Sequence, residues 1–265
     1  MNQGAKVTLR ALAAMKSERQ PISMLTAYDA TFAGEIERAG VDCVLVGDSL
    51  GNVIQGRQST VPVTLDDMVY HVGCVRRGLS RPLLLADLPF LRYADPAMAV
   101  ESSRALMQAG AEMVKLEGAA VESVARLTEL GVPVCGHLGL TPQSVHQLSG
   151  YRVQGRGEDG KRLLAEARAL ADAGCALLVL ECVPTSLGSE VAAALEIPVI
   201  GIGAGAGVDG QVLVLHDALG IGSAHPPRFV RDFVAGTGSI QAGLRAFVEA
   251  VRAREFPSAD ESYGG

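Results

Sequence analysis

The chain alternates short apolar runs with longer stretches in which apolar residues recur at helical spacing. Runs such as Val44-Leu45-Val46 and Leu177–Leu180 are apolar throughout, which is typical of strands buried on both faces of a parallel sheet. Eight strands are predicted, and their ranges are Ile22–Thr26, Val41–Val46, Leu83–Ala86, Met113–Leu116, Val134–Gly136, Leu177–Leu180, Pro198–Ile202 and Val212–Leu215.

Helical patterns fall between most of these strands, and several carry start or stop signals such as Pro96, Gly40 and Gly110. The predicted helices are Thr8–Ser17, Asp29–Ala39, Asp66–Arg77, Ala94–Ala109, Ala120–Leu130, Lys161–Ala173 and Ser239–Glu255. Strand–helix repeats build parallel sheets, and 265 residues match the ~250 of a typical (β/α)8 barrel. The pattern predicts an α/β fold: a single-domain (β/α)8 TIM barrel over 1–265 with an extra N-terminal helix. An open doubly wound sheet is the alternative.

Composition narrows the possible partners. Hydrophobic residues make up 48% and charged residues 20%, as in globular domains. The absence of Trp and a net charge of −6 argue against a nucleic-acid partner. No uncharged apolar run is long enough to span a membrane, and Met1–Lys16 lacks the apolar core of a secretory leader. The five cysteines form no CxxC pair, so reduced thiols in a cytoplasmic protein are expected.

Polar residues gather where the predicted strands end. In a barrel these ends form one face, which carries the active site. Because neighbouring strands lie ~4.8 Å apart, the carboxylates after strands two, three and four are expected to converge. Carboxylates so close together would repel one another unless a cation neutralised them. An all-oxygen set suits Mg²⁺. The polar residues at these ends are Asp48, Ser49, Asp87, Lys115, Glu117, His137 and Glu181.

Two weaker signals receive other interpretations. The segment 201–206 fits the GxGxxG/A pattern of dinucleotide-binding sites. Only Gly205–Gln211 separates the flanking strands, however, which is too short for a crossover helix, so a tight turn at the barrel mouth is predicted. Isolated histidines are more often structural than functional. We therefore interpret His71, His146, His216 and His225 as structural residues.

Several runs of the chain carry a recognisable family signature. They are Leu45–Gly51, Leu85–Phe90, Val114–Gly118, Pro133–Gln143, Gly150–Arg156, Leu180–Pro184 and Pro198–Gly205. These runs resemble segments of the ketopantoate hydroxymethyltransferase family, and Pro133–Gln143 is the most specific of them. The resemblance extends in order from about Leu25 to Glu249, with no departure at a motif position.

The resemblance implies a barrel of the phosphoenolpyruvate mutase/isocitrate lyase type that assembles as a homo-oligomer, often a decamer. It further implies transfer of a hydroxymethyl group from 5,10-methylenetetrahydrofolate to 3-methyl-2-oxobutanoate, giving 2-dehydropantoate for pantothenate biosynthesis. The reaction removes a proton from C3 of the oxo acid, and Mg²⁺ would stabilise the resulting enolate.

The family's site residues carry over by motif. Glu181 matches the catalytic base. It lies on the sixth strand, well separated around the barrel from the metal carboxylates of strands two to four. His137 is added as a further substrate contact. The match gives the Mg²⁺ site as Asp48, Asp87 and Glu117, and the oxo-acid contacts as Asp48, Ser49, Asp87 and Lys115.

Two other functions fit parts of the pattern. A Mg²⁺-dependent C–C lyase of the same superfamily would keep the metal carboxylates, but such lyases typically use a Cys in a mobile loop, and the Gly-rich loop before Lys161 has none. A non-catalytic small-molecule or nucleotide-binding protein is the alternative from another class.

Overall fold

The computed structural model describes residues 4–150, 152–222 and 226–264. Eight parallel strands close into a barrel in chain order, and the ring is completed where Ile22 and Leu25 of the first strand pair with Gly210 and Leu213 of the last. The predicted barrel is therefore confirmed, and the open sheet is excluded. The strands are β1 (Ile22–Thr26), β2 (Cys43–Val46), β3 (Leu83–Asp87), β4 (Met113–Glu117), β5 (Val134–Gly139), β6 (Leu177–Glu181), β7 (Val199–Ile202) and β8 (Gly210–Leu213).

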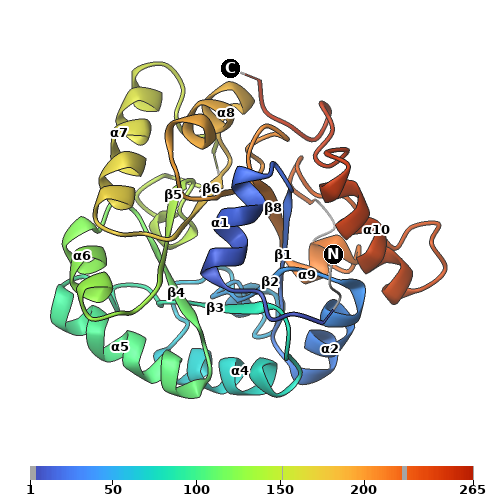
Figure 1. Cartoon of the computed structure of the whole chain (residues 1–265), viewed down its shortest axis with the longest axis horizontal. Coiled ribbons are helices and arrows are strands. Elements are labelled where there is room, and N and C mark those ends of the chain that lie inside the picture. Colours follow the sequence, from blue (N-terminus) through green and yellow to red (C-terminus); the bar gives the residue numbers. More distant parts are fainter. Residues whose placement is uncertain (1–3, 151, 223–225, 265) are drawn as a thin grey trace.

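Helices surround the barrel, and α1 lies across it (Figure 1). All seven predicted helices form, with starts and ends within three residues of the expected ones. The helices are α1 (Leu9–Ser17), α2 (Ala30–Ala39), α3 (Leu50–Val53), α4 (Leu65–Arg77), α5 (Pro96–Ala109), α6 (Val121–Glu129), α7 (Glu158–Asp172), α8 (Thr185–Ala194), α9 (Leu215–Ala218) and α10 (Ile240–Arg252), with a 3₁₀ turn at Pro142–Ser144.

Local sequence signals set several helix ends. Asp29 caps α2 by accepting hydrogen bonds from two backbone N–H groups, and Gly40 ends it with φ +88°. Thr64 and Asp67 cap the start of α4 reciprocally. These side chains satisfy the N–H groups that a helix leaves unpaired in its first turn.

Two elements differ from the sequence-based expectation. The last strand is Gly210–Leu213 rather than Val212–Leu215, because the backbone N–H of Leu215 donates to Thr26 Oγ1 at 2.9 Å and α9 begins there. Helix α8 was not predicted, since its sequence TSLGSEVAAA lacks a pronounced amphipathic stripe. Gly188 lets this helix pack closely, because a Cβ there would lie 2.3 Å from Ala204 O.

The β7–β8 connection follows the prediction made from its length. Residues 203–209 join the two strands without a helix, so the glycine-rich run does not begin a dinucleotide-binding strand–helix–strand unit. Gly203 follows β7 at the barrel mouth with φ +64°.

Helix α1 closes the N-terminal end of the barrel. Leu12 is buried against the cluster that fills the barrel interior, which includes Ile22 and Met24. Lys16 fixes the helix through a 2.6 Å ion pair with Asp209. The apolar face of α1 therefore acts as a plug. All five cysteines, including the buried Cys43 and Cys135 of the interior, are free thiols.

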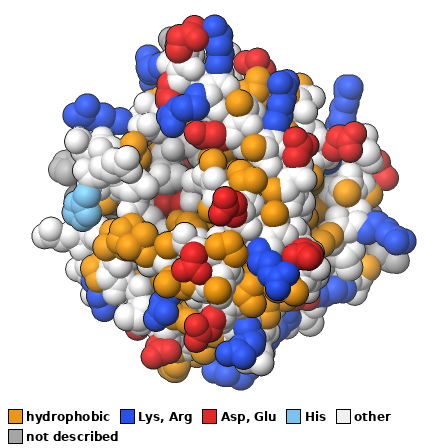
Figure 2. Space-filling model, turned by 90° about the vertical axis from the view of Figure 1, so that its left-hand side faces the viewer, with side chains coloured by type: hydrophobic (Ala, Val, Ile, Leu, Met, Phe, Trp, Pro, Cys, Tyr) orange, Lys and Arg blue, Asp and Glu red, His pale blue; other side chains and the backbone are white. Residues whose placement is uncertain are grey.

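The outer surface carries mixed charge. Acidic and basic side chains alternate over the face in Figure 2, with hydrophobic side chains in patches between them and a hollow at one side. Within the described ranges, no helix has the length and apolar character needed to cross a membrane.

Candidate active site at the mouth of the barrel

The polar strand ends meet at one cavity, as predicted. A cavity of about 970 Å³ occupies the C-terminal mouth of the barrel, the face on which barrel enzymes carry their active sites. Asp87, Glu117 and Glu181 are the last residues of their strands, so each side chain is placed by the sheet itself. All seven predicted site residues line this cavity: Asp48, Ser49, Asp87, Lys115, Glu117, His137 and Glu181.

Lys115 is the central cation of the site. Its Nζ lies 2.6 Å from Asp87 Oδ1 and 3.2 Å from His137 Nδ1. Burial alone would lower the pKa of Lys115, but the carboxylates of Asp87, Glu117 and Asp48 outweigh it and raise that pKa. The amine is therefore charged, and it donates to His137 Nδ1.

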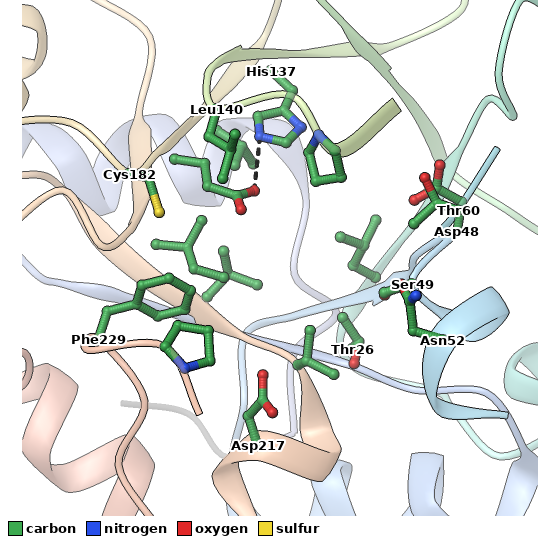
Figure 3. Close-up of a pocket in the computed structure, with 18 of the residues that line it drawn as sticks. Thr26, Asp48, Ser49, Asn52, Thr60, His137, Leu140, Cys182, Asp217 and Phe229 are labelled. Carbon is green, nitrogen blue, oxygen red and sulfur yellow. Dashed lines mark ion pairs between the residues drawn. The ribbon is translucent and has the colours of Figure 1, made fainter. Parts of the chain in front are cut away.

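His137 faces the carboxylate of Glu181 with its other nitrogen. Burial and the neighbouring Lys115 lower the pKa of His137, so the ring is neutral at pH 7. Because Nδ1 accepts from Lys115, the ring proton sits on Nε2, 3.2 Å from Glu181 Oε2. Figure 3 marks this pair with a dashed line. The two groups are close but not aligned as a hydrogen bond, which leaves the Glu181 carboxylate available to another proton.

The backbone fixes Glu181 at the junction of β5 and β6. Leu140 N–H donates to Glu181 O at 2.8 Å. Gly139, with φ +90°, makes this approach possible, since a Cβ there would lie 2.2 Å from that carbonyl oxygen. Burial raises the pKa of the Glu181 carboxyl, and His137 partly offsets this. A carboxylate with a raised pKa is a stronger base than an exposed one.

The residues present fit a magnesium ion. Asp48 and Asp87 are adjacent, because Asp48 N–H donates to Asp87 Oδ2 at 3.0 Å. Burial and the charges of Asp87 and Glu117 raise the pKa of Asp48 well above its ordinary value. Asp87 Oδ1 is buried without a well-aligned hydrogen bond, although Lys115 Nζ is close. One lysine thus faces several buried carboxylates, and a divalent cation would relieve this excess of negative charge.

The three metal candidates do not form one tight cluster. Among the residues that the structure describes, no three His, Cys, Asp or Glu side chains are close enough to hold an ion together. Glu117 instead accepts from Gln143 N–H at 2.9 Å. Mg²⁺ commonly takes only one or two protein carboxylates, with waters and substrate oxygens completing its shell. The geometry fits Asp48 and Asp87 as direct ligands, with Glu117 outside them.

Gln143 connects the carboxylates, and the sequence analysis assigned it no role. Its Nε2 donates to Asp48 Oδ2 at 2.8 Å and to Leu88 O at 2.9 Å, while its Oε1 accepts from Tyr93 OH at 2.6 Å. The side chain is buried, so its full set of hydrogen bonds fixes Asp48. The only sequence signal for a role of Gln143 was its place in Pro133–Gln143, the run that resembles the family most specifically, because a single glutamine forms no motif with a characteristic spacing.

Replacing Gln143 with leucine is expected to destabilise the protein by about 1–3 kcal/mol, because buried oxygens of Asp48 and Leu88 lose their donor. Tyr93→Phe, which removes one hydrogen bond, is expected to cost about 1 kcal/mol. Urea unfolding of both variants measures this, with the exposed Gln147 changed to leucine as the matched control. Equal stability of Gln143→Leu and the control would contradict this role.

Ser49 lies on the opposite rim from Glu181. Its Oγ is 2.9 Å from Tyr28 OH, and it directly precedes the short helix α3 without a capping hydrogen bond from its side chain. Burial raises the pKa of Tyr28, so this hydroxyl stays protonated and the pair can donate one hydrogen bond into the cavity.

His216 packs on Tyr28 with ring centroids 5.6 Å apart and also lines the cavity. His71 Nδ1 lies 2.6 Å from Tyr28 O, and His225 is outside the described residues.

The fold and the charged cavity define a (β/α)8 barrel of the kind that carries an active site at the C-terminal ends of its strands. The structure is similar in fold to a phosphoenolpyruvate phosphomutase from Streptomyces platensis subsp. rosaceus, with a TM-score of 0.60, 15% identity, and 78% of this chain and 81% of that chain covered. It is also similar in fold to 2,3-dimethylmalate lyase, which is a member of the PEP mutase/isocitrate lyase superfamily. The TM-score is 0.58 and the identity 17%, with 80% of this chain and 82% of that chain covered. At such identities the likeness concerns the fold alone.

Sequence comparison is more specific. Residues 6–259 match the family model of ketopantoate hydroxymethyltransferase. The chain is 53% identical to 3-methyl-2-oxobutanoate hydroxymethyltransferase of Shewanella loihica, covering 98% of this chain and 99% of that protein. It is 54% identical to the protein of the same name from Chromohalobacter salexigens, covering 97% and 99%. The chain belongs to the ketopantoate hydroxymethyltransferase family, as its motifs had suggested.

Proposed function

We propose that the chain transfers a hydroxymethyl group from 5,10-methylenetetrahydrofolate to C3 of 3-methyl-2-oxobutanoate. Water completes the overall reaction, which yields 2-dehydropantoate and tetrahydrofolate. One observation carries the proposal: a buried carboxylate with a raised pKa, Glu181, shares a single cavity with the Asp48, Asp87 and Lys115 group. Proton abstraction beside a carbonyl needs this combination of a positioned base and stabilised negative charge.

The β2–β4 side of the cavity suits the oxo acid. Lys115 supplies a fixed positive charge for the substrate carboxylate, and Ser49, oriented by Tyr28, supplies a hydroxyl donor. Asp48 and Asp87 would hold Mg²⁺, with Glu117 behind them. When bound, the ion would supply positive charge for the enolate oxygen.

Glu181 removes the C3 proton in this proposal. It projects from β6, while the metal carboxylates project from β2 to β4, so it approaches the substrate from outside the metal's ligands. The Nε2–H of His137 lies beside the carboxylate and favours its charged form. The C3 carbon of the enolate then attacks the one-carbon group of the folate.

Calorimetric titration separates this proposal from its rivals. Binding of 3-methyl-2-oxobutanoate only in the presence of Mg²⁺, without binding of NAD, is expected. NAD binding without oxo-acid binding would favour a nucleotide-binding protein. Conversion of a small oxo or hydroxy acid into two fragments, without folate, would favour a lyase.

A homo-oligomer, such as the decamer typical of the family, is part of the proposal. Large apolar side chains such as Tyr70 and Leu91 are 68% and 57% exposed, and hydrophobic patches are visible between the charges in Figure 2. Burial of such side chains favours association. Sedimentation at micromolar concentration is expected to give a species several times the 27.5 kDa of the chain, and a clean monomer would contradict it. A cytoplasmic location is also proposed, because the five cysteines form no CxxC pair and all are free thiols.

A further inference from the structure

We infer that the β6–β8 side of the cavity binds the pterin ring of the folate donor, with Asp217 accepting hydrogen bonds from its aminopyrimidinone edge and Phe229 packing against the ring. This inference rests on the proposed function, because that function supplies the folate. It assigns roles to residues that are not among the proposed contacts of the oxo acid or the metal.

The cavity is divided into two chemically different parts. Most of its charged groups project from β2 to β6. The wall beyond β6 carries Asp217 and His216 but is otherwise mainly apolar and aromatic, and its apolar residues are Ile202, Val212, Val214, Ile221, Phe229 and Tyr263. A volume of about 970 Å³ lies near the upper end of the range for drug-sized ligands, ~300–1,000 Å³. A small branched oxo acid fills only a minor part of it. The apolar side therefore has room for a second, larger reactant.

Phe229 is held firmly at this apolar side. Gly203 gives it space, since a Cβ on that residue would lie 2.8 Å from Phe229 Cδ1 and 3.1 Å from Tyr263 Cε2. Tyr263 is fixed in turn, because Thr185 N–H donates to its carbonyl oxygen at 2.9 Å. Phe229 is almost completely buried, and Figure 3 shows its ring on the cavity side of the chain. A rigid aromatic ring in an apolar wall favours a flat, aromatic ligand.

Asp217 is the acid of this side of the cavity. It follows β8 on the short helix α9, and in Figure 3 its carboxylate points into the cavity, across from Cys182 and Leu140. No Lys or Arg of the described residues forms an ion pair with it. Burial raises the pKa of its carboxyl. Hydrogen-bond donors from a ligand would stabilise its charged form.

The aminopyrimidinone edge of a pterin matches this arrangement. It presents a ring N–H and an amino group side by side in one plane, which a carboxylate can accept as two parallel hydrogen bonds. Asp217 lies on α9, which follows β8, and Glu181 ends β6. The two strands are two strand spacings apart in the barrel, roughly 10 Å. A bicyclic ring with its one-carbon substituent spans this distance. With its edge on Asp217, the donor would present the one-carbon group near the carbon that Glu181 deprotonates.

Asp217→Asn tests the inference, because it keeps the side-chain shape but replaces one acceptor with a donor. Two probes are titrated: tetrahydrofolate, and an analogue in which a methyl group replaces the 2-amino group. Wild-type protein is expected to bind the analogue about ten- to a hundredfold more weakly than tetrahydrofolate. Asp217→Asn is expected to weaken tetrahydrofolate binding by a similar factor and to remove most of the difference between the two probes. Asp172→Asn, an exposed acid on α7, is the matched control.

A second variant tests the packing surface. Phe229→Leu is expected to weaken both probes by the same factor, because it removes ring packing and leaves the hydrogen bonds. Unchanged tetrahydrofolate affinity in Asp217→Asn, or an equal loss for both probes, would overturn the inference. Solvent exchange at C3 of the oxo acid, which needs no folate, is measured on each variant and is expected to persist. Failure of the wild-type protein to bind tetrahydrofolate at all would instead overturn the proposed function.

Discussion

Glu181→Gln is expected to slow solvent exchange of the C3 hydrogen of 3-methyl-2-oxobutanoate by ~10²–10⁴-fold, the usual contribution of a positioned base. Exchange needs only the protein, Mg²⁺ and the oxo acid, so it isolates proton removal from one-carbon transfer. Glutamine keeps the shape of the side chain but cannot take a proton. Binding of the oxo acid with Mg²⁺ is expected to persist, because the charged groups proposed to hold the substrate lie on β2 to β4. Proton NMR in D₂O measures the exchange.

The pH dependence of exchange gives a second readout. Only the ionised Glu181 can accept the proton, so the rate is expected to rise with pH as that carboxyl ionises. Because burial raises its pKa above the ordinary 4.5, this rise is expected at higher pH than for an exposed glutamate. Lys115→Met is the matched comparison, and it is expected to weaken substrate binding before it affects exchange at saturation. Near-normal exchange in Glu181→Gln would reassign the base, with His137 next in line.

Asp87→Asn is expected to weaken Mg²⁺-dependent binding of the oxo acid by more than about 100-fold, since even residues that only orient metal ligands typically contribute 10–100-fold to metal affinity. Asparagine keeps the shape of the side chain and removes its charge. The change also takes the charged partner from buried Lys115, whose Nζ is 2.6 Å from Asp87 Oδ1, and breaking such a pair is destabilising. Calorimetry at several Mg²⁺ concentrations measures the loss.

A double variant separates metal binding from folding. Asp87→Asn with Lys115→Met removes both members of the closest buried pair, so neither is left without the other, and the double variant is expected to recover part of the stability but not metal-dependent binding. Electron paramagnetic resonance with Mn²⁺ as a probe reports metal affinity without any turnover. Full activity of Asp87→Asn in the presence of EDTA would contradict the assignment of the metal site.

The barrel and the general position of the site could be predicted because both follow from strand periodicity. Apolar runs predicted eight strands, and the polar residues at the ends of strands two to six marked the mouth. All seven predicted site residues line one cavity. Their detailed contacts depend on tertiary packing. The contact of Lys115 with both Asp87 and His137 arises from side-chain directions on neighbouring strands, which sequence spacing does not specify.

The missed residues share a physical reason. Gln143 and Tyr93 act through hydrogen bonds between segments about 50 residues apart, and Phe229 and Tyr263 reach the cavity from loops beyond the last strand. Loops lack the periodicity on which sequence reasoning depends. Helix α8 was missed for another reason. Its buried residues Leu187, Gly188, Val191 and Ala192 share one face, but a glycine within this face and exposed alanines outside it weaken the contrast between apolar and polar positions.

Product formation with a labelled donor tests the central claim most directly. The protein is incubated with Mg²⁺, 3-methyl-2-oxobutanoate and 5,10-methylenetetrahydrofolate carrying ¹³C in its methylene group, and the products are followed by carbon NMR. The account predicts that the label appears in the hydroxymethyl carbon of 2-dehydropantoate, and that Glu181→Gln abolishes this signal. Label that stays on the folate while the wild-type protein binds both substrates would contradict it.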